Sequence, residues 1–233
     1  MWAKNKQSGF TIVELLIVVV VIAILAAITI ISYNGIQERT RISGAQSFSA
    51  QVTRSPDMLD ATAIYNFDEC SGTTAKDLSE AKNDGSLTGT LSWSTDTPSG
   101  RGCSVSFDGT GQINTSAVIG SNFYIKSAWV KTTSCGSSNN IISGPGSAFY
   151  SCNLKAGHNG SWTALATSGS IGDGKWHHVM LKYDNGNITI YVDGRNIGSA
   201  AQNAPTTFTN QIGALGSANR YVGLIDDVVI IAR

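Results

Sequence analysis

The sequence predicts an α+β chain in which a long N-terminal α-helix precedes an antiparallel β-sandwich. Two observations support this class. No residue from Leu15 to Ile31 is charged, and the chain after Pro56 is rich in Gly, Ser, Thr and Asn with short apolar runs. Short strand-like runs separated by Gly-rich turns are typical of sandwiches. The change in composition near Pro56 therefore divides the chain into a helical part and a strand-rich part.

The charges are balanced overall but divided unevenly between these two parts. The 233 residues contain 16 basic and 16 acidic side chains; residues 1–55 carry a net charge of +3, which leaves −3 for residues 56–233. No Lys/Arg cluster follows one face, so the composition does not indicate a nucleic-acid partner. Lys4 and Lys6, which precede the apolar segment, are typical of a terminus that stays in the cytoplasm.

The apolar segment is long enough to cross a membrane. Counted from Phe10 it has 22 residues, and as a helix it would extend about 33 Å. It is longer than the apolar part of a usual cleaved secretory signal. Its one charged residue is Glu14. A charged side chain inside a membrane costs about 2.5–3.5 kcal/mol on insertion scales and usually has a partner, which argues against a plain anchor.

The segment GFTIVELLIVVVVIAILAAI, from Gly9 to Ile28, resembles the N-terminus of type IV pilins and of the related pseudopilins of secretion systems. The matched motif is a short basic leader that ends in Gly9, followed by Phe10 and, four residues later, Glu14. The resemblance implies that residues 1–9 are a prepilin leader. A prepilin peptidase would cut between Gly9 and Phe10, and the new amine of Phe10 would be methylated. It also implies a protein that resides first in the bacterial inner (cytoplasmic) membrane and then in a pilus, or fimbrium, on the cell surface.

Cleavage would place a cationic amine on Phe10 beside the bilayer. Two lone charges in a low-dielectric medium are costly, whereas the amine of an incoming subunit could pair with Glu14 of its neighbour. This pairing would fix the register between helices that otherwise offer only smooth apolar faces. Glu14 is therefore predicted to be an assembly residue, through which the helix contacts other pilin subunits.

The helix is predicted to continue beyond the membrane as a stem, so that residues 10–55 form one transmembrane and stem helix. Beyond Ile31, apolar residues recur with the helical period on one face, at Ile42, Ala45, Phe48 and Val52. The helix should end at Ser55, because the residue before a proline avoids helical conformations.

Residues 56–233 are predicted to form the sandwich. The strongest local signal is a hairpin in which the runs Trp176–Tyr183 and Ile188–Val192 flank an Asn-Gly turn. Other predicted strands are Ala63–Phe67, Cys103–Phe107, Phe123–Thr132, Asn140–Ser143, Ser147–Leu154, Thr163–Thr167, Gln211–Gly213 and Leu224–Ala232.

Six segments of this part resemble, in order, the laminin-G-like domains of the concanavalin A-like lectin/glucanase type. They are YNFDECSGTTAKD (Tyr65–Asp77), SVSFDGTG (Ser104–Gly111), SAWVKT (Ser127–Thr132), GDGKWHHVMLKYDNG (Gly172–Gly186), ITIYVDG (Ile188–Gly194) and VGLIDDVVIIAR (Val222–Arg233). The resemblance implies a concanavalin A-like jelly roll, in which two packed antiparallel sheets bring the first and last strands side by side. It does not identify a ligand.

All four cysteines lie in the second part of the chain, and an even number beyond an export segment indicates two disulfides. Three connectivities are possible. The expected strand positions favour Cys70–Cys103 and Cys135–Cys152, because the first pair could meet at one edge of the sandwich and the second closes a short loop between neighbouring strands.

A structural calcium ion is one prediction for Glu69, Asp77 and Asp226. Glu69 and Asp226 would lie at strand ends on the core side, where an uncompensated carboxylate is costly. Calcium takes about six to eight oxygen ligands, and Asp77 with loop carbonyls could complete the shell. Relatives with this sandwich often bind calcium where the terminal strands meet. The alternative is that these carboxylates accept backbone N–H bonds without an ion, and the sequence leaves both open.

A glycan site would need exposed aromatic rings beside polar side chains. Trp162, Tyr150 and Tyr221 lie in loop-rich sequence and are the candidate ligand-binding residues, whereas Trp129 and Trp176 lie within strand runs and are predicted to be core. Glycan-cleaving sandwiches need two carboxylates about 5–10 Å apart, commonly on one strand. The sequence has no such run, so neither a catalytic residue nor enzyme activity is predicted.

The sequence thus predicts a minor pilin that displays a lectin-like adhesive head, with surface glycans as its partners. Two rival functions stay open: a major structural pilin whose head is only a coat, and a pseudopilin of a secretion system. The size of the predicted head favours adhesion, because about 170 residues is large for a subunit that packs in thousands of copies.

Overall fold

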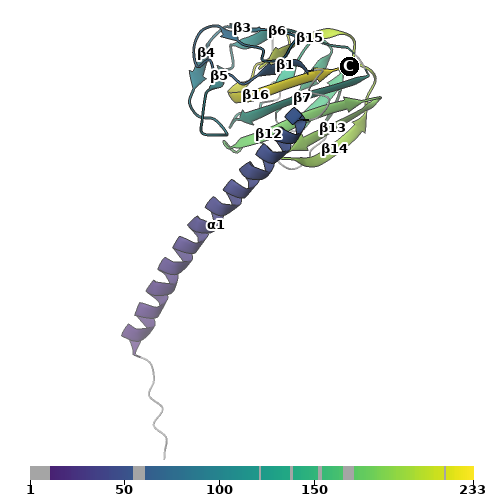
Figure 1. The fold of residues 1–233 in the computed structure, drawn as a ribbon. Helices are drawn as coiled ribbons and strands as arrows, with labels where there is room; N and C mark the ends of the chain where they lie inside the picture. The colour runs from purple at the N-terminus through teal and green to yellow at the C-terminus, as the bar shows by residue number, and fades with distance from the viewer. Residues whose placement is uncertain are drawn as a thin grey trace, which may run out of the picture. The chain divides into compact units, whose positions relative to one another are not determined.

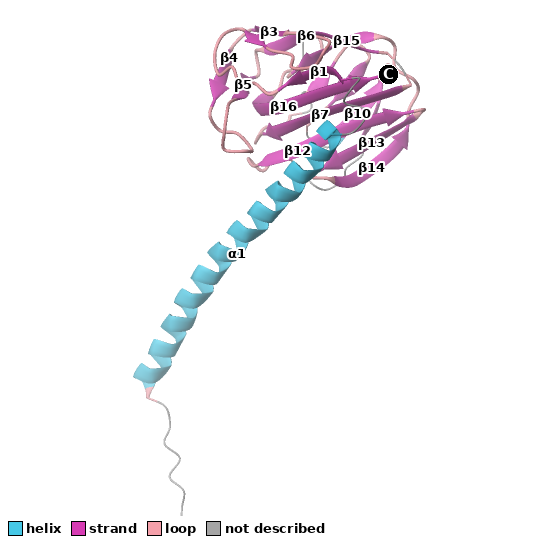
Figure 2. Ribbon diagram, viewed as in Figure 1, coloured by secondary structure: helices cyan, strands magenta, loops and turns pink. Residues whose placement is uncertain are grey.

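The structure is a computed structural model of the chain, which describes residues 11–54, 61–120, 122–136, 139–151, 154–164, 171–217 and 219–233. It confirms the α+β class: the one described helix, α1 (Ile12–Arg54), is followed by strands only (Figures 1 and 2). The chain divides into two compact units, residues 1–41 and 42–233, so that the boundary lies within α1.

The strands are β1 (Ala61–Tyr65), β2 (Thr74–Ala75), β3 (Gly85–Thr88), β4 (Leu91–Ser94), β5 (Ser104–Asp108), β6 (Gln112–Ile119), β7 (Phe123–Lys131), β8 (Ile142–Ser143), β9 (Ser147–Phe149), β10 (Lys155–His158), β11 (Ser161–Ala164), β12 (Trp176–Asp184), β13 (Asn187–Val192), β14 (Arg195–Ala201), β15 (Phe208–Ile212) and β16 (Val222–Ala232).

In the first unit, the start of α1 is fixed by a capping box. The Thr11 hydroxyl accepts the backbone N–H of Glu14 at 3.2 Å, and Glu14 Oε2 accepts both the N–H and the hydroxyl of Thr11 at 2.8 Å. The large apolar side chains described between Ile12 and Ile30 are all exposed. Within the described residues, α1 is the one helix long and apolar enough to cross a membrane.

The second unit contains two large antiparallel sheets and one small sheet. An eight-stranded sheet has the order β14-β13-β12-β7-β16-β5-β4, and β1 also pairs with β16. The second sheet has the order β2-β3-β6-β15-β8, and the small sheet the order β11-β10-β9. The first and last strands therefore lie side by side, as the resemblance implied: Ile64 is opposite Val229 and Tyr65 is opposite Val228 (Figure 1).

Alternate residues of the strands form the main core between the two large sheets. It includes Phe107 and Val130 of the first sheet and Ile113 and Ile212 of the second, all at most 2% exposed. The predicted hairpin is confirmed. Strands β12 and β13 pair from Val179 opposite Val192 to Asp184 opposite Asn187. Asn185 and Gly186 form its two-residue turn with positive φ angles of 42° and 95°, as a type I′ turn requires.

The end of α1 packs on the outer face of the eight-stranded sheet, so the predicted apolar face of the stem is confirmed. Phe48 and Val52 pack against a cluster that includes Ile125 and Met180. Ala45 is fully buried with Trp129 and Trp176, and Ile42 packs against them. The helix ends at Arg54, and residues 55–60, which include the predicted domain boundary, lie outside the described residues.

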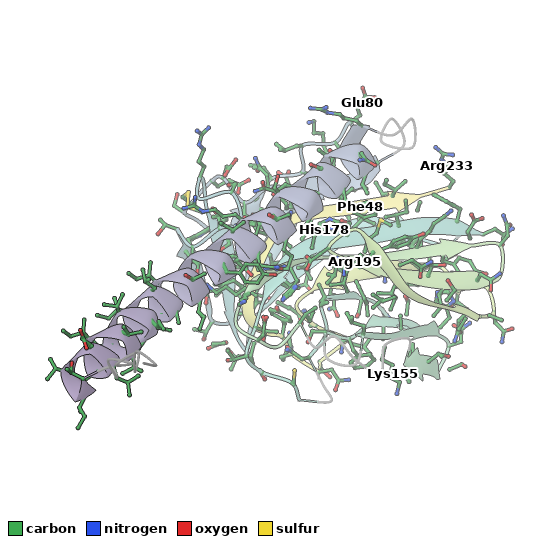
Figure 3. All side chains as sticks on the ribbon, turned by 90° about the horizontal axis from the view of Figure 1, so that it is seen from below. Phe48, Glu80, Lys155, His178, Arg195 and Arg233 are labelled. Atoms are coloured by element: carbon green, nitrogen blue, oxygen red, sulfur yellow. A yellow bond between two sulfur atoms is a disulfide. The ribbon has the colours of Figure 1, made fainter. Side chains whose placement is uncertain are left out.

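Phe48 is held by three elements of the head. Its ring lies 5.7 Å from that of His178 and 5.7 Å from that of Tyr191, and Phe48 and His178 are labelled together in Figure 3. Gly194, in the turn between β13 and β14, has a φ of +79°, and an added Cβ would lie 3.1 Å from Phe48 Cβ. Glycine at this turn therefore allows the strand connection to pass close to the stem.

The predicted disulfide Cys70–Cys103 is present, with a Cα–Cα distance of 5.4 Å. It links the segment after β1 to the start of β5. Cys135 is also disulfide-bonded. Cys152 lies outside the described residues, so the Cys135–Cys152 pairing stays a prediction.

Candidate functional site

The small sheet places two of the predicted ligand-binding residues on one face. Gly157 of β10 lies opposite Trp162 of β11, and Ala156 lies opposite Phe149 of β9. The N–H of Tyr150 donates to the carbonyl of Lys155, which continues the β9–β10 pairing by one residue. Opposite residues of a sheet share a face and successive residues alternate, so Tyr150, Lys155 and Trp162 project from the same face.

These three side chains form what we call the aromatic platform. The rings of Tyr150 and Trp162 have centroids 6.4 Å apart and meet edge to face at 74°. Lys155 Nζ lies 5.9 Å from the centre of the Tyr150 ring. All three side chains are half-buried, so each ring keeps some surface open to solvent. Lys155 lies at the rim of the head, apart from Phe48 and His178 at the stem (Figure 3).

Gly157 permits the close approach of β10 and β11 on which the platform depends. An added Cβ would lie 1.9 Å from the carbonyl oxygen of Ser161 and 3.1 Å from Cα of Trp162, both of which are backbone atoms. A side chain at this position would therefore push β11 away and move Trp162 relative to Tyr150.

The opposite face of the small sheet is anchored in the core by a buried polar network. Phe149 and Ala156 belong to the main core. His158 Nδ1 lies 2.6 Å from the carbonyl oxygen of Asn203, and His158 Nε2 lies 2.6 Å from the Tyr124 hydroxyl. A carbonyl only accepts, so Nδ1 carries the proton and the hydroxyl donates to Nε2. Burial lowers the pKa of His158 and favours this neutral form.

Lys126 of β7 lies in the same region of the core and is completely buried. Its Nζ donates to Ser147 Oγ at 3.0 Å and to the carbonyl of Ile142 at 3.3 Å, so it ties β7 to β8 and β9. The rings of Tyr124 and Phe208 lie within 5.4 Å of Nζ. Burial lowers the pKa of Lys126 to about 7.

Tyr221, the third predicted ligand-binding residue, is wrongly assigned. It is fully buried, its ring packs at 90° against Phe107, and its hydroxyl donates towards the carbonyls of Lys131 and Leu224. Its loop-like sequence suggested an exposed position, but the ring lies between the two large sheets and cannot stack on a sugar. Trp129 and Trp176 are buried as predicted, but under the stem rather than between the sheets.

The predicted calcium ligands have separate partners in the structure. Each oxygen of Asp77 accepts two hydrogen bonds; the donors are Ile64 N–H, Ser79 N–H, the Ser79 hydroxyl and Asn83 N–H, at 2.7–2.8 Å. Glu69 Oε1 accepts the N–H of Lys76 at 2.7 Å. In the described part of the chain, no group of three or more His, Cys, Asp or Glu side chains is arranged to hold a metal ion. Asp77 and Glu69 thus act as backbone acceptors, and the three carboxylates do not fit one shared site.

Asp226 lies instead with Asp68 and Asp227, which together line a cavity of about 250 Å³ that also includes Arg101 and Gly102. Burial, with the charges of Asp227 and Asp68, raises the pKa of Asp226 to about 8. Burial and the Asp68 charge raise the pKa of Asp227 to about 6. Because Asp68, Asp226 and Asp227 line one cavity, it is unfavourable for all three carboxylates to be ionised at the same time.

Calcium binding therefore stays a prediction, and Asp226 is the residue that tests it. If the ion binds beside this carboxylate, the head should melt at a lower temperature in chelator, and added calcium should restore the melting temperature. Asp226→Asn should remove that response, whereas Asp84→Asn, which changes a carboxylate paired with Lys76, should keep it. If neither chelator nor added calcium changes the melting temperature of the wild type, these carboxylates do not bind calcium.

The adjacent histidines of β12 are both buried but point to opposite faces of the sheet, and His178 is the one that faces the stem. His178 Nε2 lies 2.8 Å from Ser127 Oγ, beneath Phe48, and burial lowers the pKa of His178 to about 4. Ser127 is 2% exposed. His177 lies between Asp173 Oδ1 and Asp193 Oδ2, at 3.0 and 2.9 Å. The serine–histidine pair is therefore buried beneath the stem, and its hydrogen bond joins β7 to β12.

Of the predicted processing residues, Gly9 and Phe10, and the predicted assembly residue, Glu14, the structure describes Glu14 alone. Gly9 and Phe10 lie outside the described residues. Glu14 Oε2 serves the capping box with Thr11, a role that the sequence analysis missed although Thr-x-x-Glu before an apolar run is its signature.

Comparison of the sequence with protein families gives two matches. Residues 107–233 match the concanavalin A-like lectin/glucanases superfamily, and residues 4–30 match the prokaryotic N-terminal methylation motif. Among curated proteins, the type IV major fimbrial protein FimA of Dichelobacter nodosus is 45% identical over 49 residues. The match covers 21% of this chain and 31% of FimA, so the chain spans about a third of the length of that relative.

Among solved structures, domain 4 of AbnA, a GH43 extracellular arabinanase from Geobacillus stearothermophilus in complex with arabinotriose, has a TM-score of 0.60. It is 21% identical, and the match covers 74% of this chain and 92% of that domain. A mutant of Trypanosoma rangeli sialidase displaying trans-sialidase activity has a TM-score of 0.50 at 14% identity, over 75% of this chain and 31% of the sialidase chain. At these identities, the likeness shows the fold alone.

Proposed function

Because the chain belongs, through residues 107–233, to the concanavalin A-like lectin/glucanases superfamily and begins with a type IV pilin N-terminus, we propose that it is a minor pilin whose head binds glycans. The apolar part of α1 would hold the subunit in the inner membrane before assembly and in the filament afterwards. The head would then be displayed on the cell surface as an adhesin.

The aromatic platform is the observation that carries the binding role. Tyr150, which directly follows β9, and Trp162 of β11 meet on one face and keep part of their ring surface open. Aromatic rings bury a large apolar area at a small entropic cost, which suits stacking on the apolar face of a sugar. The domain of AbnA with the same fold is in complex with arabinotriose, which supports a glycan rather than a protein ligand. The proposal is of binding without catalysis.

The binding role is tested with the full chain in detergent micelles on a broad glycan array. Trp162→Ala should reduce binding at least tenfold while leaving the melting temperature nearly unchanged. The matched control is Trp93→Ala, which removes a half-buried tryptophan from β4 at an edge of the eight-stranded sheet and should leave glycan binding intact. Single-site affinity should be weak and should increase when heads are clustered on a fibre. A well-folded wild-type chain that binds no glycan would remove the adhesive role.

The two alternative functions, major structural pilin and pseudopilin, predict a different abundance of this chain in filaments. A major structural pilin should be the most abundant subunit in sheared filaments, and a pseudopilin should be absent from them. The adhesin proposed here should be present in few copies. Quantifying the chain against other pilins in sheared filaments separates the three functions.

The pilin N-terminus predicts a role for the charge of Glu14 that is separable from its capping role. Glu14→Gln keeps a side-chain oxygen for Thr11 but removes the charge that would pair with the Phe10 amine. We expect export and cleavage to continue and incorporation into filaments to fall severely, as measured by the amount of chain in sheared pili. Equal incorporation of Glu14→Gln and wild type would remove the ion-pair role.

Cleavage itself has an independent readout. N-terminal sequencing of the processed chain should begin at Phe10, and replacement of Gly9 should block processing. A chain taken from assembled filaments that still begins at Met1 would contradict the assignment of residues 1–9 as a leader.

A further inference from the structure

The aromatic platform lies in a long part of the chain that has no carboxylate. Between Asp108 and Asp173 the sequence contains no Asp or Glu, and this interval includes the whole small sheet. Its three lysines differ in their surroundings. Lys126 is completely buried in the core, and Lys131 pairs with Asp96 at 2.5 Å. Lys155 forms no ion pair with any residue that the structure describes.

Two other lysines on the head surface are each paired with a carboxylate. Lys76 pairs with Asp84 at 2.6 Å, and Lys182 pairs with Asp184 at 2.8 Å. Lys155 instead lies on the Tyr150 ring, and by strand register it is the diagonal neighbour of Trp162. A ring face attracts an ammonium group but does not neutralise its charge. The platform therefore presents two rings and one uncompensated positive charge.

We propose that the platform selects glycans that carry a negative charge, with a carboxylate or sulfate group on the sugar bound by Lys155 while an aromatic ring stacks on the sugar. This rests on the proposed function and specifies its ligand class. An anionic sugar meets no opposing carboxylate from the small sheet, whereas on a carboxylate-rich surface it would be repelled. A neutral sugar could use the rings but would leave the Lys155 charge unused.

The charge supplies selectivity more than affinity. A half-exposed ion pair contributes modestly, so an acidic glycan should bind about fivefold more tightly than an uncharged glycan of the same shape. The preference should depend on salt, because raising the ionic strength from about 0.1 M to about 1 M shortens the screening length from about 10 Å to about 3 Å.

The experiment uses the full chain in detergent micelles and pairs of probes that differ only in charge. Oligogalacturonate and its methyl ester test carboxylate, and dextran sulfate and unmodified dextran test sulfate. We expect the charged member of at least one pair to bind about fivefold more tightly at low salt and the difference to shrink at high salt. Lys155→Met should abolish the preference and Lys155→Arg should keep it. Lys182→Met, which alters a lysine paired with Asp184, should change nothing.

The outcomes separate this inference from the function on which it rests. Equal binding of charged and uncharged members, binding to uncharged glycans alone, or a preference that survives in Lys155→Met would overturn the selectivity for anions and leave the adhesive head intact. A chain that binds no glycan on the broad array would overturn both. The Lys155 variants are expected to melt at the same temperature as wild type, because the side chain is half-exposed. Measuring their melting temperatures shows whether a loss of binding is caused by unfolding.

Discussion

A head that begins at Pro56 is expected to melt far below one that begins at Ile42, or to fail to fold. The sequence placed the boundary of the sandwich at residue 56, whereas the compact unit of the structure begins at Ile42. Removing residues 42–55 would uncover Trp129 and Trp176 and the apolar cluster around Met180, which the stem covers. Lost burial of apolar surface costs about 25 cal/mol per Å², so a face of this size contributes several kcal/mol.

One residue of the stem should account for a large share of this difference. Phe48→Ala in the 42–233 head should lower the free energy of unfolding by about 2 kcal/mol, because a half-buried ring loses less than a fully buried one. Thermal and urea denaturation measure the effect. Gln51→Ala, on the exposed side of the same helix, is the control and should change the stability little. Equal melting of the two truncated heads would show that the stem does not contribute to the core.

Lys126→Met is expected to stabilise the head strongly, and most strongly below pH 7. In the folded head the pKa of Lys126 is about 7, against 10.5 for an unburied lysine. Between these values the unfolded chain holds one proton more than the folded chain, so the stability of the wild type rises with pH from about 7 to about 10.5. Below pH 7 Lys126 is charged in both the folded and the unfolded chain, so the full cost of burying its charge lowers the stability of the wild type. At about 1.4 kcal/mol per pKa unit, this penalty is at most about 5 kcal/mol.

The measurement is the melting temperature of the 42–233 head, wild type and variant, from pH 6 to pH 10. The gain from Lys126→Met should be largest at pH 6 and should shrink towards pH 10. Lys182→Met is the matched control: it lies on the neighbouring strand β12, pairs with Asp184 and should show no such gain. A variant that melts lower than wild type at every pH would mean that the bonds of Lys126 to Ser147 and Ile142 outweigh its burial.

Local patterns were sufficient to predict the helix, its apolar stem face and the β12–β13 hairpin. Each of these depends on residues close together in the sequence: the helical period from Ile42 to Val52, or the Asn-Gly turn between two β-branched runs. Strand β6 was missed because Asn114, Ser116 and their neighbours have low strand propensity. In the structure they alternate with the buried Ile113, Ala117 and Ile119, and pairing with β3 and β15 holds them extended.

The sequence by itself therefore determined the pilin-like N-terminus and the sandwich, because their signals are short motifs or fixed periods. The disulfide Cys70–Cys103 was only favoured among three connectivities until the structure showed it. Tertiary structure alone decided which polar and aromatic residues are available for binding. Tyr150 and Trp162 meet because Gly157 lets β10 and β11 approach, Tyr221 is buried between the sheets, and Asp77 is saturated by four hydrogen bonds. The exposure and the partners of a side chain are set by strands that are distant in sequence, and the residue type at one position does not encode them.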